Sequence, residues 1–160
     1  MTARLILVLI AVTILADQLT KAVALSLLVP GVAVPVLPGF NLALGFNEGS
    51  SFGMLSGVMA GKPLLMAALT GALTAILTVM AFWAQHRFER AGLALIVGGA
   101  LGNIMDRLRQ GAVTDFLDLY WRDWHWPTFN VADIAITFGA LCILAASLPL
   151  RRKEPDLEQN

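Results

Sequence analysis

Residues 63–85 read PLLMAALTGALTAILTVMAFWAQ, a stretch without a single charged side chain. A helix needs about 20 apolar residues to cross the hydrocarbon core of a bilayer, which is about 30 Å thick. The stretch therefore predicts a membrane-spanning helix. The composition agrees, because 58% of the 160 residues are hydrophobic and 14% are charged, whereas soluble domains average about 25% charged residues.

Three further segments fit the same length rule. We expect spans at residues 5–29, 91–106 and 131–150, in addition to 63–85. The span at 91–106 is short, so its helix should continue with polar residues that face protein rather than lipid. The sequence thus predicts an all-α membrane protein, a bundle of four transmembrane helices that forms a single domain over residues 1–160.

Four spans place both termini on one side of the membrane. The short connection 86–90 lies on that side and is rich in Arg, as is the basic cluster at 151–153. Because Lys and Arg concentrate in short cytoplasmic segments, we expect both termini in the cytoplasm. Two longer segments, 30–62 and 106–130, then lie outside.

The outer segments carry two patterns of their own. Apolar residues alternate over 40–46, which predicts a strand with one apolar face, and Gly and Ser at 49–51 predict a turn after it. Tyr and Trp residues cluster at 120–126. Such aromatic clusters are typical of the lipid headgroup layer.

Polar side chains gather near the outer ends of the predicted spans. Asp17 and Lys21 are four residues apart, as are Asn103 and Arg107, so each pair shares one face of its helix. Asp133 begins the fourth span at the same side. An ionised Asp at the bilayer centre costs about 2.5–3.5 kcal/mol, so acids near lipid usually have a function. The coincidence predicts one site.

Two of the acids suggest chemistry. Asp115 and Asp133 would form a pair in low dielectric, where like charges cannot both ionise easily and one carboxyl keeps a proton. No His or Cys residues are spaced as metal ligands, since His86 and His125 are expected on opposite sides. The net charge of zero gives no reason to expect nucleic acid as a partner.

Five short stretches, taken in order, carry a resemblance. They are DQLTK at 17–21, NEGSSF at 47–52, GGALGNIMDR at 98–107, VTDF at 113–116 and FNVAD at 129–133. Together they resemble the motifs of the lipoprotein signal peptidase family, also called signal peptidase II. Each motif alone is weak, but five in order on a chain with four spans are specific.

The resemblance implies an aspartic endopeptidase of the bacterial cytoplasmic (inner) membrane. It would remove signal peptides from prolipoproteins, cutting just before a cysteine that carries a diacylglyceryl group. It implies a four-helix bundle with a small β-structured cap on the outer, periplasmic side, near which the active site lies. It also implies no cofactor and no metal, contact with membrane lipid, inhibition by cyclic lipopeptides, and a monomer.

The resemblance also assigns the site residues. Asp115 and Asp133 match the catalytic aspartates, one taking a proton from water and the other polarising the scissile carbonyl; which does which stays open. The positions expected to bind substrate or support the pair are Asp17, Lys21, Asn47, Gly49, Gly102, Asn103, Arg107, Asn130 and Ala132.

Simpler structural roles remain possible for several of these residues. Asp17 and Lys21 could be a neutralising pair that lets the first helix insert. Asn130 could cap the fourth helix, alone or together with a role in the site. The run from Gly98 to Gly102 is expected to serve helix packing first.

Three other acids are expected outside the chemistry. We expect Asp106 to form an ion pair with Arg107 or Arg109 at a helix end. Asp118 and Asp123 should be solvated acids of the second outer segment.

Two other kinds of function remain as alternatives. A proton-coupled small transporter would also carry intramembrane acids, but it predicts acids spread across the membrane depth and an internal repeat, and this sequence shows neither. A non-catalytic membrane scaffold gives no reason for Asn and Asp to collect at the ends of three different spans.

Overall fold

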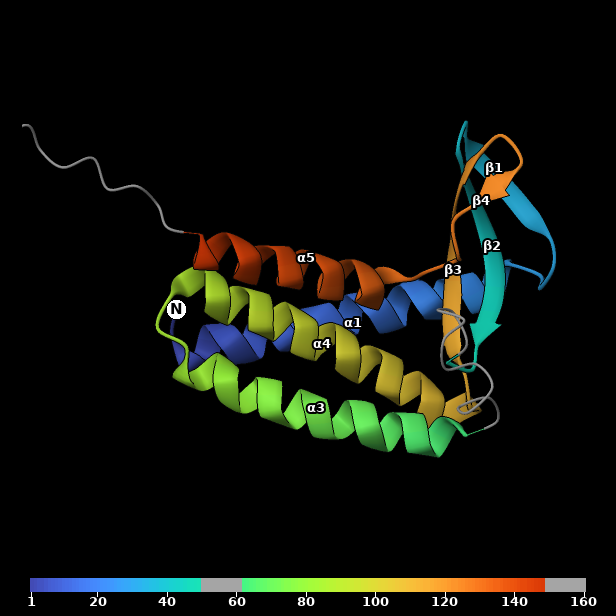
Figure 1. Cartoon of the computed structure of the whole chain (residues 1–160). Coiled ribbons are helices and arrows are strands. Elements are labelled where there is room, and N and C mark those ends of the chain that lie inside the picture. Colours follow the sequence, from blue (N-terminus) through green and yellow to red (C-terminus); the bar gives the residue numbers. More distant parts are fainter. Residues whose placement is uncertain (50–61, 149–160) are drawn as a thin grey trace, which may run out of the picture.

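The structure, a computed structural model, describes residues 1–49 and 62–148. In these residues four helices run side by side, and a small antiparallel sheet lies across one end of them (Figure 1). The helices are α1 (Ala3–Leu27), α3 (Pro63–Trp83), α4 (Arg87–Gln110) and α5 (Val131–Ser147). By length and composition α1, α3 and α4 could each cross a membrane, and α5 is an apolar helix of 17 residues. The prediction of a mainly helical membrane protein with a small sheet is confirmed.

Helix α4 is longer at both ends than the predicted span 91–106. It begins at Arg87, so the charged connection predicted at 86–90 is mostly its first turn. Glu89 lies in that turn, where the positive end of the helix dipole favours an acid. The helix continues to Gln110 with Asp106 buried against protein, as expected for a continuation with polar residues. Gly111 ends it at φ 81°, a left-handed conformation that favours glycine.

Glycines allow α4 to lie close to both α1 and α5. A Cβ atom on Gly98 would lie 2.7 Å from the Cβ of Thr13 on α1. A Cβ on Gly99 would lie 2.5 Å from the backbone oxygen of Ala132 on α5. Both distances are too short for real carbon contacts, so the packing role predicted for this glycine run is confirmed.

The end of the bundle away from the sheet is packed with hydrocarbon. Its buried core consists of Ile6, Ile10, Ala81, Ala84, Leu93, Ala94 and Val97. Large apolar side chains on the outer helix faces are about half exposed, among them Leu5, Val12, Leu19, Leu73 and Phe138. Such faces are compatible with surrounding lipid. We call the end of the bundle that contains this hydrocarbon core the far end, and the end that carries the sheet the sheet end.

The sheet has the order β1-β2-β3-β4, with all neighbours antiparallel. Its strands are β1 (Ala33–Leu37), β2 (Phe40–Asn47), β3 (Val113–Trp121) and β4 (Trp124–His125). The predicted strand over 40–46 is confirmed, but its single apolar face is wrong. Phe46 is 50% exposed whereas Asn41 is 7% exposed, because the register shifts between Leu42 and Gly45.

Two acids of the second outer segment differ from each other. Asp123 lies exposed in the turn between β3 and β4, as predicted. The expectation that Asp118 is solvated is wrong, since only 3% of it is exposed. Its carboxylate accepts a hydrogen bond from Asn41 at 2.9 Å and pairs with Nδ1 of His125 at 2.8 Å. A buried carboxylate needs such partners.

Parts of four predictions fall outside the described residues. These are positions 50–51 of the expected turn, positions 50–52 of the motif at 47–52, positions 149–150 of the fourth span, and the basic cluster at 151–153.

Candidate active site

Strand β3 and the start of α5 bring two acids near each other. After Gly111 the chain enters β3. Asp115 is the third residue of this strand, and only 2% of the residue is exposed. Asp133 lies in the first turn of α5. Its charge is close enough to act on the Asp115 carboxyl.

Asn130 connects the two acids. As the N-cap of α5, its Oδ1 accepts a hydrogen bond from the backbone N–H of Asp133 at 3.0 Å. Its own backbone N–H donates to Oδ2 of Asp133 at 3.2 Å, which completes a capping box. The amide nitrogen at the other end of the side chain donates to Oδ1 of Asp115 at 2.7 Å. The predicted capping role is confirmed, and it coexists with a role in the site.

Two further asparagines hold the remaining carboxylate oxygens. Asn103 donates to Oδ1 of Asp133 at 3.0 Å. Asn47 donates to Oδ2 of Asp115 at 3.2 Å. Gly45 lies opposite Asp115 in the sheet, so Asn47 is its diagonal neighbour across the two strands. Each of the four oxygens therefore accepts a hydrogen bond.

The surroundings of Asp115 favour its protonated form. The pKa of Asp115 is raised from 3.8 to about 6. Burial is the larger cause of this rise, and the charge of Asp133 is the second. Hydrogen bonds from Asn130 and Asn47 and the charge of Lys21 act in the opposite direction. Desolvation prevails because it penalises the charged carboxylate directly.

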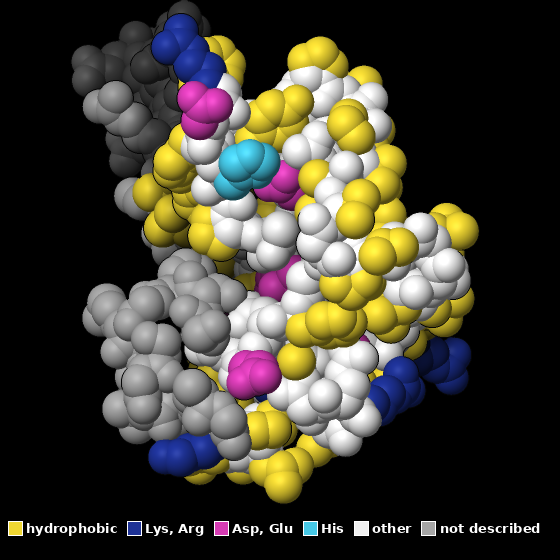
Figure 2. Space-filling model, turned by 90° about the vertical axis from the view of Figure 1, so that its right-hand side faces the viewer, with side chains coloured by type: hydrophobic (Ala, Val, Ile, Leu, Met, Phe, Trp, Pro, Cys, Tyr) yellow, Lys and Arg dark blue, Asp and Glu magenta, His cyan; other side chains and the backbone are white. Residues whose placement is uncertain are grey.

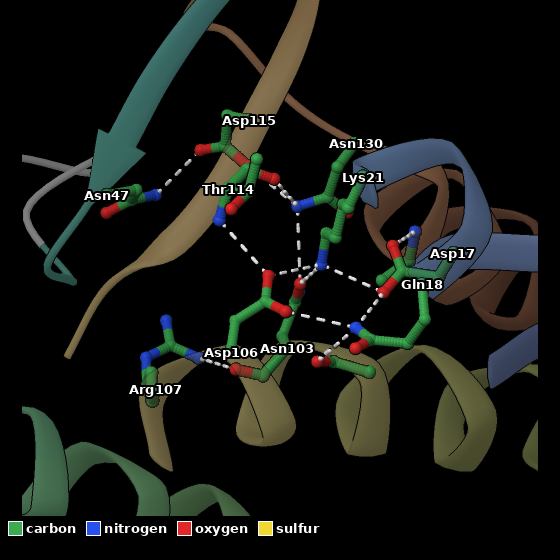
Figure 3. A network of polar contacts seen from close by, with 12 residues as sticks. Asp17, Gln18, Lys21, Asn47, Asn103, Asp106, Arg107, Thr114, Asp115 and Asn130 are labelled. Carbon is green, nitrogen blue, oxygen red and sulfur yellow. Dashed lines mark hydrogen bonds and ion pairs between the residues drawn. The ribbon is translucent and has the colours of Figure 1, made fainter. Parts of the chain in front are cut away.

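Lys21 is the centre of a buried ion cluster, which Figure 3 shows. Its Nζ lies 2.9 Å from Oδ2 of Asp17, 2.8 Å from Oδ2 of Asp106 and 2.9 Å from Oδ1 of Asn103. An ammonium has three N–H donors, so all of them are used. The predicted pairing of Asp17 with Lys21 is confirmed. The expectation that Asp106 pairs with Arg107 or Arg109 is wrong, because its carboxylate faces α1.

Asp17 also reaches α5. Its Oδ1 accepts a hydrogen bond from the backbone N–H of Ala132 at 2.9 Å. A Cβ atom on Gly102 would lie 2.5 Å from Oδ2 of Asp17, so only glycine leaves room for this carboxylate. Ala132 is completely buried. These contacts explain in physical terms why a glycine and a small residue occupy these two positions.

Arg107 and Gly49 complete the set of predicted residues. The Arg107 side chain donates to the backbone oxygen of Asn103 at 3.5 Å. Among the described residues its buried Nε has no hydrogen-bond partner, so a donor remains for another molecule. Gly49, at φ 105°, donates its N–H to Oδ1 of Asn47 at 2.8 Å and thereby orients that side chain.

The structure brings all the predicted site residues to one end of the bundle. It adds three that sequence reasoning did not assign to the site, namely Gln18, Asp106 and Thr114. Gln18 donates to both Asp17 and Asp106, at 3.1 and 3.0 Å. All three lie within stretches singled out as motifs, at 17–21, 98–107 and 113–116. The contact between Gln18 and Asp106 joins residues 88 positions apart in the chain. In residues 1–49 and 62–148 no three His, Cys, Asp or Glu side chains are grouped as a metal site requires.

Figure 2 shows the molecule from the sheet end. Hydrophobic side chains cover much of this face, and acidic side chains are visible between them. Beside the acids, α1 and the sheet enclose an apolar groove of about 270 Å³. Leu42 of β2 and Phe116 of β3 form one wall, and residues from Leu19 to Leu27 of α1, with Leu28 after it, form the other. Phe116 directly follows Asp115 in β3, so the groove and the acid pair share this strand.

Comparisons with known proteins agree on one family. The model of the family described as signal peptidase (SPase) II matches residues 9–149. A lipoprotein signal peptidase of Polynucleobacter necessarius subsp. necessarius (strain STIR1) is 41% identical over 138 residues, covering 86% of this chain and 85% of the relative. One from Paraburkholderia phytofirmans is 43% identical over 140 residues, covering 86% of this chain and 80% of the relative.

Two solved structures share the fold. Both are described as bacterial membrane enzymes whose structures were determined by the in meso method, at 1.9 Å and 2.3 Å resolution. The first has a TM-score of 0.80 and 26% identity, and covers 92% of this chain and 94% of its own. The second has a TM-score of 0.80 and 25% identity, and covers 99% and 96%.

Proposed function

This chain belongs to the signal peptidase II family, and we propose that Asp115 and Asp133 are the catalytic pair with which it cleaves the signal peptides of prolipoproteins. One observation carries the assignment. A single side chain, that of Asn130, hydrogen-bonds to the carboxylate of Asp115 and to the backbone N–H of Asp133. Asn130 therefore links the two acids to each other, as a water-activating pair requires.

The contacts suggest which acid carries the proton. Asp133 accepts hydrogen bonds from Asn103 and from a backbone N–H at the positive end of α5, both of which favour a carboxylate. The pKa of Asp115, raised to about 6, makes Asp115 the better proton holder. We assign Asp133 as the base that takes a proton from water. Asp115 then polarises the scissile carbonyl and helps to protonate the leaving amine.

The other residues of the site differ in whether they have a hydrogen-bond donor left for the substrate. Arg107 retains a buried donor, which suits a substrate carbonyl arriving from lipid. Within residues 1–49 and 62–148, Asn47 donates one of its two amide hydrogens, to Asp115, and we propose that the second binds a peptide oxygen. Lys21 has no spare N–H, so its part is to support the acids.

The substrate is a prolipoprotein, and we place its diacylglyceryl-modified cysteine at the sheet end. The apolar groove beside Phe116 suits hydrocarbon chains. We further propose four membrane spans with both termini in the cytoplasm and the sheet at the outer face of the bacterial inner membrane. The enzyme would act as a monomer in contact with lipid and be inhibited by cyclic lipopeptides.

The test is cleavage of a prolipoprotein, with and without diacylglyceryl on its cysteine, by purified wild-type protein and by Asp115→Asn and Asp133→Asn. We expect only the lipidated form to be cut, and each variant to lose about 10³-fold or more in rate, as single knockouts in other proteases do. Asp123→Asn removes an exposed acid in the turn between β3 and β4 and should cleave normally. Cleavage retained by either dyad variant would refute the pair.

A further inference from the structure

Two buried carboxylates flank Lys21 in the same manner. Asp17 binds Lys21 with one oxygen and accepts the backbone N–H of Ala132 with the other, at 2.9 Å. Ala132 is the residue directly before Asp133. Asp106 binds Lys21 and accepts the backbone N–H of Thr114 at 3.1 Å. Thr114 is the residue directly before Asp115. Each carboxylate therefore fixes the backbone one residue ahead of one acid of the pair.

Both oxygens of the Asp106 carboxylate accept hydrogen bonds. Its Oδ2 accepts from Lys21 at 2.8 Å and from Thr114, and its Oδ1 accepts from Gln18 at 3.0 Å. Only 5% of the residue is exposed. Asp106 thus links three elements, because it lies on α4, Lys21 and Gln18 on α1, and Thr114 on β3 (Figure 3).

We propose that Asp106 is a positioning residue for Asp115, the counterpart of Asp17 for Asp133, and that Lys21 joins the two into one clamp that sets the geometry of the acid pair. The clamp acts through backbone N–H groups, so it fixes where the two main chains lie and does not itself bind the carboxylates of Asp115 and Asp133. This inference rests on the proposed function of the pair.

The clamp also contributes charge. The charged groups that act on Asp115 from the elements around it are Lys21 of α1, Arg107 of α4 and Asp133 of α5. Asp106 of α4 is paired with Lys21. Removing the negative charge of Asp106 would leave Lys21 less neutralised. The loss of the negative charge and the stronger net positive charge at Lys21 both favour the ionised form of Asp115, so both lower its pKa. A residue that serves only to hold the fold would not change this pKa in a defined direction.

The experiment compares Asp106→Asn with wild type in steady-state cleavage of a lipidated prolipoprotein across pH. We expect kcat to fall by up to about 10²-fold, the size of effect that a misplacement of about 1 Å produces, with KM little changed. We also expect the alkaline limb of kcat/KM to move to lower pH. Wild-type kcat, or a lower kcat with an unmoved limb, would overturn the proposal.

A second variant covers the case in which Asp106→Asn does not fold. Asp106→Glu keeps the charge beside Lys21 but displaces the carboxylate by one methylene from the N–H of Thr114. It should lower kcat while leaving the alkaline limb in place, and wild-type kcat would again overturn the proposal. Asp123→Asn, which also removes one acid, is the matched control and should change neither quantity.

Asp115→Asn, measured in parallel, separates the two proposals. If Asp115→Asn remains active, the proposed catalytic pair is wrong. If Asp115→Asn is inactive and Asp106→Asn behaves as wild type, only the clamp is wrong.

Discussion

Helices α1 and α4 pack against each other by different means at their two ends. At the far end the contact is hydrocarbon, with Ile6 and Ile10 of α1 against Leu93 and Val97 of α4. At the sheet end the same two helices meet through Lys21 and the acids and amides around it. In lipid, burying hydrocarbon gives helices little drive to associate, so shape and polar contacts decide. The far end therefore aligns the helices, and the sheet end fixes the geometry of the site.

The largest effect on turnover among support residues should come from Lys21→Met. The substitution leaves the carboxylates of Asp17 and Asp106 facing each other without their cation. Removing one partner of a buried ion pair costs about 3–5 kcal/mol of unfolding free energy. Turnover should fall by at least about 10²-fold, because Asp17 and Asp106, which anchor the backbone before Asp133 and Asp115, lose the cation that holds them together.

Thermal unfolding in detergent and cleavage assays would measure both quantities for Lys21→Met. Lys62→Met, at an exposed position before α3 with no capping hydrogen bond, is the matched control and should resemble wild type. A Lys21→Met protein with unchanged Tm would show that the ion cluster does not hold the sheet end together.

Two glycine substitutions on α4 compare the ends directly. A Cβ on Gly102 would lie 2.5 Å from Oδ2 of Asp17, and a Cβ on Gly92 would lie 2.5 Å from the backbone oxygen of Gly139. Both Gly102→Ala and Gly92→Ala should lower Tm, since a helix has to move in each. Only Gly102→Ala displaces a member of the clamp, so only it should lower kcat, by about 10²-fold at most.

Gly71→Ala is the control for these two substitutions, because a Cβ there has no atom within 4 Å and alanine favours a helix over glycine by about 1 kcal/mol. It should leave kcat unchanged. Equal losses of kcat in Gly92→Ala and Gly102→Ala would remove the distinction between the two ends.

A titration is expected at the sheet end. Folding raises the pKa of Asp115 to about 6, so the protonated carboxyl is favoured in the folded state. Its contribution to stability is fully present below the ordinary value of 3.8 and is lost as pH rises through about 6. Asp115→Asn should therefore abolish a fall in Tm between about pH 4 and pH 6.

The same proton predicts the pH dependence of activity. Because Asp115 has to be protonated, kcat/KM of the wild type should fall about tenfold per pH unit well above its pKa of about 6. The limb of kcat should lie at higher pH, since bound substrate excludes water and disfavours the carboxylate. A kcat/KM that still rises above the pKa of Asp115 would reverse the assignment of the two acids.

The sequence allowed prediction of features that depend on short spacing. Apolar length predicted the helices, and the four-residue step from Asp17 to Lys21 predicted their shared face and pairing. The position of Asn130 at the start of an apolar span predicted its cap. In each case the deciding interaction lies within one or two helical turns, where the chain's own geometry determines it.

The features that sequence reasoning missed depend on partners distant in the chain. Asp106 was expected to pair with a neighbouring Arg, but Lys21, on another helix, reaches it at 2.8 Å. Asp118 was expected in solvent, but the pairing of β2 with β3 brings Asn41 to it. Strand β3 itself lacks the alternation that predicts strands, since its first four residues, Val113–Phe116, are all buried.

The smallest effect on turnover is expected from Leu93→Ala. Leu93 is 2% exposed in the hydrocarbon core of the far end, and its loss leaves a cavity. Leu→Ala costs about 2.7–5 kcal/mol in the core of a soluble protein. The cost here should lie at or below the lower limit, because detergent or lipid solvates the unfolded side chain and mainly van der Waals contacts are lost.

Turnover of Leu93→Ala should nonetheless equal that of wild type per folded molecule. About 15 Å of helix separates Leu93 from Asn103, the first residue of α4 that contacts the acid pair. Leu73→Ala, at a position on α3 that is 56% exposed, controls for the loss of side-chain volume without a cavity. A loss of kcat in Leu93→Ala as large as in Gly102→Ala would mean that the bundle transmits strain along its length. The two ends would then act as one unit, and the contacts at the sheet end would not by themselves determine the geometry of the site.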